Sequence, residues 1–168
     1  EVTTTRATRT SEIDPKAPYY VIANTSASAV QAVNKAISQG KSVYLTDDGY
    51  IVDRDTFASL LPNYAIYGEA LYKVPNGPTL KPLKIYSPNY HYDWTGVDAP
   101  AHTSLVLEKL GFQIVDTPDE ADVIVLENNR FDASIFGKKP TLVIGGEAMQ
   151  KLEKFGVLAG FDAEKLKG

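Results

Sequence analysis

Short apolar runs alternate with amphipathic stretches along this chain, in the rhythm that is typical of α/β proteins. Tyr19–Ala23 has the aromatic and β-branched composition of a buried strand. One of residues 24–26 can cap a following helix, in which Val33 and Ile37 share a face, and Gly40 marks its end. The pattern predicts a β-α segment here.

Residues 42–73 continue this N-terminal segment with shorter predicted strands and a shorter predicted helix. Residues 42–46 and 50–52 are strand-like and flank a turn at 47–49. Residues 56–61 predict a short helix that begins after Asp53 or Asp55, and 65–68 predict a return to a sheet. We therefore expect an N-terminal β-α segment over 18–73.

The second half has a more regular rhythm and follows a proline-rich boundary at about 74–82. Strands are predicted at 83–86, 112–115, 121–126 and 141–144, and helices at 101–110, 132–136 and 148–155. Such alternation predicts a mainly parallel sheet with helices on both faces. We expect a three-layer, flavodoxin-like unit over 83–168, or one continuous domain over 18–168. The Thr-rich residues 1–17 are predicted to be a flexible arm or linker.

Composition narrows the classes of function. The net charge of −4 supplies no basic surface for nucleic acid. No apolar run reaches the roughly 18 residues that cross a bilayer, so membrane insertion is not expected. The absence of cysteine removes thiolate zinc sites and cysteine nucleophiles. We predict no cofactor.

Both histidines and the only tryptophan fall within residues 90–102, between a predicted strand and a predicted helix. Connections of this kind carry ligands in many α/β proteins. Aromatic residues alternate here with Tyr86 at the start, and they either stack on a sugar or peptide ligand or cover the end of the sheet. The predicted ligand-binding residues in this segment are Tyr90, His91, Tyr92, Asp93, Trp94 and His102.

A second candidate lies in the turn after the predicted strand 141–144, where the chain reads Gly145, Gly146 and Glu147. Glu147 either contacts a ligand or complements the dipole of the following helix. The two glycines suit a tight turn, although they lack the rest of a phosphate-binding motif. We include all three residues among the predicted ligand contacts.

A metal site is an alternative for the histidine-containing segment. Imidazole and carboxylate groups of His91, Asp93, Asp98 and His102 suit zinc, manganese or iron, and would serve a metal-dependent hydrolase. Each also has a simpler role as a solvated loop group or a cap. An acid–base hydrolase would instead pair a histidine with a carboxylate such as Glu127.

Several segments together resemble a known domain. They are 84–86, Trp94-Thr95-Gly96, 102–112, 121–126 and 142–146. They resemble the glutamine-amidotransferase-like α/β domain that accompanies the catalytic domain of some secreted zinc-carboxypeptidase-like proteins. The resemblance covers about half the chain and rests on apolar and glycine patterns.

The resemblance implies an accessory role. Active amidotransferases carry a cysteine in the turn that here reads Gly145-Gly146-Glu147, and the zinc carboxypeptidases place a glutamate three residues after a histidine, where this chain has Trp94 and Leu105. We therefore expect a non-catalytic domain of a larger secreted or cell-surface protein. Its expected partners are the other domains of that protein and a sugar or peptide ligand, with a carbohydrate-binding module as an alternative.

Overall fold

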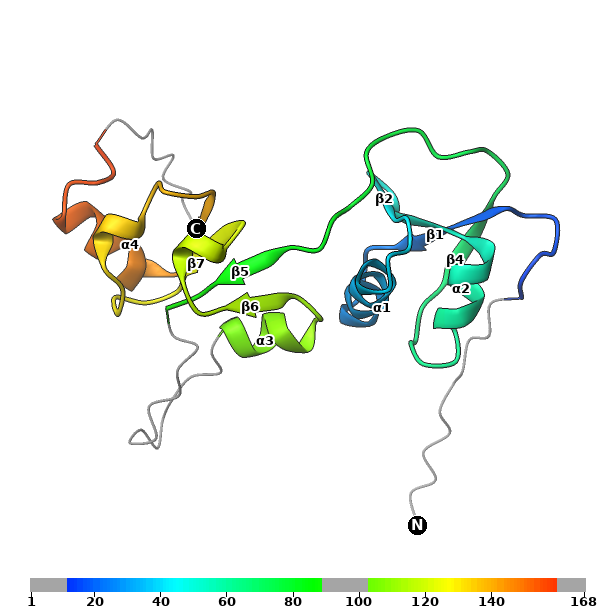
Figure 1. The fold of residues 1–168 in the computed structure, drawn as a ribbon, viewed down its shortest axis with the longest axis horizontal. Helices are drawn as coiled ribbons and strands as arrows, with labels where there is room; N and C mark the ends of the chain where they lie inside the picture. The colour runs from blue at the N-terminus through cyan, green and yellow to red at the C-terminus, as the bar shows by residue number, and fades with distance from the viewer. Residues whose placement is uncertain (1–11, 89–102, 160–168) are drawn as a thin grey trace, which may run out of the picture. The chain divides into compact units, whose positions relative to one another are not determined.

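The computed structural model describes residues 12–88 and 103–159 (Figure 1). The chain divides into two compact units. The N-terminal unit comprises the described part of Glu1–Pro82 with Lys109–Phe112, and the C-terminal unit comprises the described parts of Leu83–Glu108 and Gln113–Gly168. One unit holds a four-stranded antiparallel sheet and the other a four-stranded parallel sheet, so the protein is of mixed α/β type.

The N-terminal unit has the element order β-α-β-β-α-β. Its elements are β1 (Tyr19–Ala23), α1 (Ala27–Ser38), β2 (Tyr44–Thr46), β3 (Gly49–Asp53), α2 (Arg54–Leu60) and β4 (Gly68–Leu71). The strands lie in the order β2-β3-β1-β4, and every neighbouring pair is antiparallel. This is the split β-α-β arrangement of ferredoxin-like domains.

Both helices of this unit begin at side-chain caps. The Ser26 hydroxyl accepts a hydrogen bond from the Ala29 amide at 3.2 Å, and the Asp53 carboxylate accepts one from the Thr56 amide at 2.9 Å. Each bond satisfies an amide that has no partner within the first helical turn. Ser26 and Asp53 are both among the predicted caps, while α2 begins at Arg54, before the predicted range 56–61.

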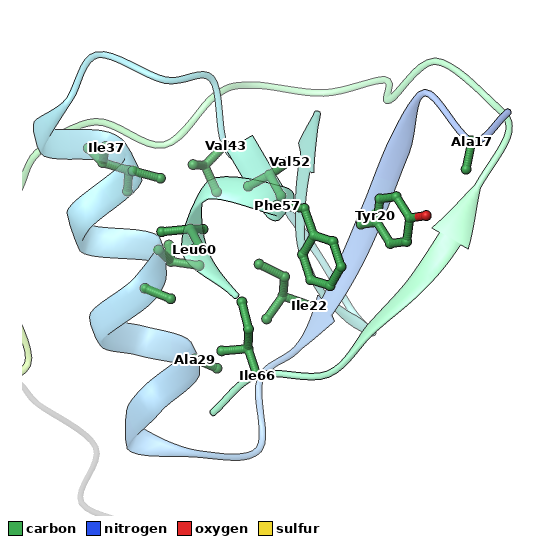
Figure 2. Close-up of a cluster of buried hydrophobic side chains, with 13 residues drawn as sticks. Ala17, Tyr20, Ile22, Ala29, Ile37, Val43, Val52, Phe57, Leu60 and Ile66 are labelled. Carbon is green, nitrogen blue, oxygen red and sulfur yellow. The ribbon is translucent and has the colours of Figure 1, made fainter. Parts of the chain in front are cut away.

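The core of the N-terminal unit lies between the two helices and one face of the sheet (Figure 2). The Tyr20 ring stacks on the Phe57 ring, with centroids 4.4 Å apart and planes 8° apart. Val33 and Ile37 bring the predicted face of α1 into the same cluster. The other tyrosines of this half are not all in the core, because Tyr67 and Tyr72 are 52% and 62% exposed.

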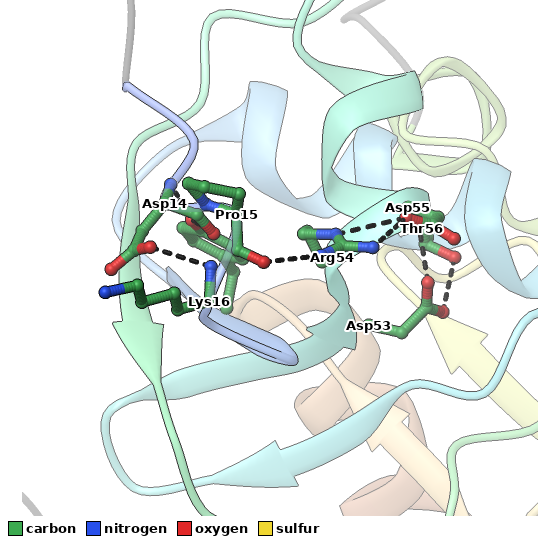
Figure 3. A network of polar contacts seen from close by, with 8 residues as sticks. Asp14, Pro15, Lys16, Asp53, Arg54, Asp55 and Thr56 are labelled. Carbon is green, nitrogen blue, oxygen red and sulfur yellow. Dashed lines mark hydrogen bonds and ion pairs between the residues drawn. The ribbon is translucent and has the colours of Figure 1, made fainter.

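A turn before β1 is tied to the rest of the unit (Figure 3). The Tyr72 hydroxyl donates to the Asp14 carboxylate at 2.6 Å, and Arg54 donates to the Pro15 carbonyl at 2.7 Å. Ala17 is fully buried. The hydrogen bond from Tyr72 is the main reason that the pKa of Asp14 lies below its ordinary value, and it raises the pKa of Tyr72. The last residues of the range expected to be an arm are therefore fixed to the unit.

The C-terminal unit alternates strands and helices. Its elements are β5 (Lys84–Tyr86), α3 (Thr103–Lys109), β6 (Gln113–Val115), β7 (Val123–Leu126), β8 (Thr141–Val143) and α4 (Gly146–Lys154), with short 3-10 helices at Pro118–Glu120 and Ala133–Ile135. The strands lie in the order β6-β5-β7-β8, and every neighbouring pair is parallel.

Helix α4 packs on the sheet through Ala148 and Leu152, which are both fully buried beside Ile124 and Leu126. Two other apolar residues of the predicted helix at 148–155 stay largely outside this contact, since Met149 is 36% exposed and Phe155 61% exposed. The small Ala148 side chain lets the helix approach the sheet closely.

The prediction of a mainly parallel sheet fits only the C-terminal unit. In the N-terminal unit the short turn between β2 and β3 forces these strands to run antiparallel, and β3 then inserts between β2 and β1. The strand expected at 65–68 lies at Gly68–Leu71 instead. Among the described residues, no helix is long and apolar enough to cross a membrane.

Candidate functional site

The carboxyl ends of β5, β7 and β8 meet at one edge of the parallel sheet. From β5 the chain passes through α3 to β6 on one side, and it later returns to β7 on the other side of β5. The connections that leave β5 and β7 therefore diverge, which makes the β5–β7 position a topological switch point. Open α/β sheets bind their ligands in the crevice at such a point.

Three connections are in direct contact at this edge. Glu127 lies just beyond β7, and one of its carboxylate oxygens accepts a hydrogen bond at 2.7 Å from the Thr103 amide at the start of α3. The Ile144 amide, just beyond β8, donates to the Leu126 carbonyl at 2.7 Å. A Cβ atom added to Gly145 would lie 3.4 Å from the Glu127 carbonyl oxygen. We call these connections, with Ser87 after β5, the switch-point edge.

Ser87 is the most unusual polar group of the switch-point edge. It directly follows β5, is only 1% exposed, and its hydroxyl has no hydrogen-bond partner among the described residues. A buried polar group without a partner costs about 1–3 kcal/mol. Native proteins keep few of them, and a ligand atom that bonded to this hydroxyl would remove the cost.

The turn after β8 places the predicted residues Gly145, Gly146 and Glu147 at the same edge. Gly145 has a φ of 88°, a conformation that favours glycine, and α4 begins at Gly146 without a side-chain cap. Glu147 lies in the first turn of α4, so it has the position required to complement the helix dipole.

Glu147 also lines an open pocket of about 410 Å³. The pocket lies between α4 and the connection after β7, and its lining residues are Asn129, Glu147, Gln150, Lys151, Lys154 and Phe155. Charges of both signs and one exposed aromatic ring suit a polar ligand with an apolar face, such as a sugar or a peptide. The two roles considered for Glu147 are therefore compatible in position.

The connection after β7 is held in place by Lys151. Its ammonium group donates to the carbonyls of Asn129, at 2.7 Å, and Phe131, and it lies 4.8 Å from the centroid of the Phe131 ring. Asp132 then accepts a bond from the Ser134 amide at 2.9 Å. Hydrogen bonds from the Ser134 amide and hydroxyl hold the pKa of Asp132 below its ordinary value. Hydrogen bonds therefore fix the connection after β7, which contributes Asn129 to the lining of the pocket.

The aromatic segment itself falls outside the described residues. Tyr90, His91, Tyr92, Asp93, Trp94 and His102 all lie there, as does Asp98 of the alternative metal site. Their predicted roles stay predictions. Tyr86, the first aromatic residue of the series, packs against the buried cluster around Ile124 and Leu126. Within residues 12–88 and 103–159, no three His, Asp or Glu side chains gather to hold a metal ion.

Sequence reasoning missed Ser87, Asn129 and Lys151. Asn129 comes shortly after the predicted strand 121–126, so the rule that ligands bind after parallel strands would have found it. Ser87 follows β5 in the same way, but its burial without a partner depends on packing that no local pattern encodes. Lys151 lies on a helix, and only the folded chain brings it to the connection after β7.

No protein family model, curated protein or solved structure matches the chain.

Proposed function

We propose that the chain is a non-catalytic accessory domain of a larger secreted or cell-surface protein of the zinc-carboxypeptidase-like group. Its C-terminal unit binds a sugar or peptide at the switch-point edge. The observation that carries this proposal is the buried Ser87 hydroxyl, which has no partner among the described residues and lies at the β5–β7 switch point.

We also propose a flavodoxin-like or amidotransferase-like architecture for the C-terminal unit. Numbered from β5, the strand order of the C-terminal unit is 2-1-3-4, which is the order with which flavodoxin-like sheets begin. This order supports a flavodoxin-like or amidotransferase-like unit with helices on both faces. The accessory role and the secreted location rest on the resemblance to domains of that group.

The proposed ligand contacts are Glu147 with its two preceding glycines and the aromatic segment over 90–94 with His102. Tyrosine and tryptophan rings stack on the apolar faces of sugars, and a carboxylate accepts hydrogen bonds from hydroxyl or amide groups. The connection that leaves β5 leads directly into the aromatic segment. The net charge of −4 supports a neutral or polar ligand over nucleic acid.

Trp94 supplies the readout for a test, because it is the only tryptophan of the chain. Its fluorescence is followed while the chain is titrated with chitohexaose and, separately, with a tetrapeptide. We expect a saturable change in emission with one of them. In Glu147→Gln the dissociation constant should rise about tenfold or more, since a hydrogen bond to a charged group contributes about 1.5–3 kcal/mol.

Glu153→Gln is the matched control, since Glu153 is an exposed carboxylate on the same helix and does not line the pocket. Its dissociation constant should equal that of the unchanged chain. Absence of a saturable response to either ligand would refute the binding role at this edge. Hydrolysis of either ligand, lost in Glu127→Gln, would replace the non-catalytic assignment with an enzymatic one.

A further inference from the structure

A second pocket lies in the N-terminal unit, on the face of the sheet opposite the helices. Side chains alternate along β1, so that Tyr20 and Ile22 enter the core while Val21 and Ala23 point to the other face. Glu69 of β4 is the register partner of Val21 and therefore lies on that face as well. The pocket has a volume of about 360 Å³ and is lined by Val21, Ala23, Asp48, Tyr67 and Glu69. We call it the β4 pocket.

The β4 pocket combines three kinds of surface. Val21 and Ala23 form an apolar floor of half-buried side chains. Tyr67 adds an aromatic ring that is 52% exposed. Asp48 and Glu69 add two exposed carboxylates, and within residues 12–88 and 103–159 neither forms a hydrogen bond or an ion pair. Among the residues that the structure describes, no lysine or arginine lines the pocket.

We propose that the β4 pocket binds an arginine side chain of a peptide or protein partner. A guanidinium group carries several donors in a rigid plane, so it can bond to a carboxylate while its face lies on the Tyr67 ring. The methylene stem of the arginine then covers Val21 and Ala23. Carboxylates, an aromatic ring and an apolar floor without competing cations are the groups that such a side chain requires.

This site is independent of the proposed function, because it belongs to the other unit and uses none of the residues of the switch-point edge. The two proposals therefore fail separately. A chain that binds no sugar or tetrapeptide can still bind arginine at the β4 pocket, and the reverse also holds.

The test is an ¹⁵N–¹H NMR titration of the whole chain with acetyl-Gly-Arg-Gly-amide. The matched control peptide replaces arginine by citrulline, which has nearly the same shape and no charge. We expect the amides of Ala23, Asp48 and Glu69 to shift with the arginine peptide and to respond at least threefold more weakly to the citrulline peptide. The response should also fall as salt is added, because the contacts are exposed.

Two variants locate the contacts. Glu69→Gln removes one carboxylate without changing its size, and Tyr67→Ala removes the ring, and both side chains are exposed, so the fold should persist. Each should raise the dissociation constant about two- to fivefold. Glu153→Gln on α4 should not change it.

Three results would overturn the proposal. They are equal binding of the citrulline peptide, unchanged affinity in both Glu69→Gln and Tyr67→Ala, and shifts of the same amides by calcium chloride at a lower concentration than by the arginine peptide. The last result would assign the two carboxylates to a divalent cation instead.

Discussion

Gly68, the first residue of β4, lies against the aromatic ring of Phe57. A Cβ atom at this position would be 2.5 Å from two ring carbons of Phe57, far inside van der Waals contact. The ring cannot move away easily, because Phe57 is fully buried and stacked on Tyr20 (Figure 2). Glycine is therefore required here by packing rather than by backbone conformation.

We expect Gly68→Ala to lower the free energy of unfolding of the N-terminal unit by about 1–3 kcal/mol, which is the usual cost of overpacking a core. Urea denaturation followed by circular dichroism measures the change. In the double variant Gly68→Ala/Phe57→Leu the smaller side chain leaves room for the new methyl group, so the loss should be less than the sum of the two single losses. An additive result would show that the ring does not cause the cost.

At the scale of elements, the start of α2 depends on the ionised form of Asp53. Burial works to raise the pKa of this carboxyl group. Hydrogen bonds from the Thr56 hydroxyl and amide and from the Asp55 amide, together with the charge of Lys41, outweigh the burial and hold the pKa below its ordinary value of 3.8. The carboxylate oxygens lie 2.6 and 2.9 Å from the two Thr56 donors.

This lowered pKa predicts a pH dependence of stability. The folded state holds its proton less tightly than the unfolded state does, so the extra stability is present above about pH 3.8 and is lost as the pH falls through the folded pKa. We expect Asp53→Ala to cost about 0.5–2 kcal/mol at neutral pH. Asp53→Asn keeps a capping acceptor and should lose less.

Urea titrations of the unchanged chain and of Asp53→Asn at several pH values test this dependence. The difference in the free energy of unfolding should shrink as the solution becomes more acidic, because the protonated aspartate no longer gains from its charge. A difference that stays constant with pH would contradict the assignment of the lowered pKa to Asp53.

The elements also show what local sequence can specify. The cap of α1 at Ser26 and the bounds of β1 follow from side chains within a few residues, and both were predictable. Strand order in the N-terminal unit was not, because a β-α-β pattern is equally consistent with β1 and β2 as direct neighbours and with β3 inserted between them. At the switch-point edge, the turn at 145–147 followed from strand order. The burial of the Ser87 hydroxyl without a partner among the described residues depends on packing that no local pattern encodes.

At the scale of the whole molecule, the described residues form two buried clusters that share no residue. One includes Tyr20 and Phe57, and the other includes Ile124, Leu126 and Leu152. Each cluster lies within one of the two compact units. A loss of packing in one cluster should therefore destabilise its own unit first.

Leu152→Ala tests this independence. Leu152 is fully buried against the parallel sheet, so its truncation should cost about 2–5 kcal/mol in the C-terminal unit. Hydrogen exchange read by mass spectrometry should show faster exchange of β5, β7, β8 and α4, with β1, β3 and α1 unchanged. Gly68→Ala should give the converse pattern. Faster exchange of both units in both variants would mean that the chain unfolds as one cooperative body. A ligand bound at the switch-point edge would then also stabilise the unit that holds the β4 pocket.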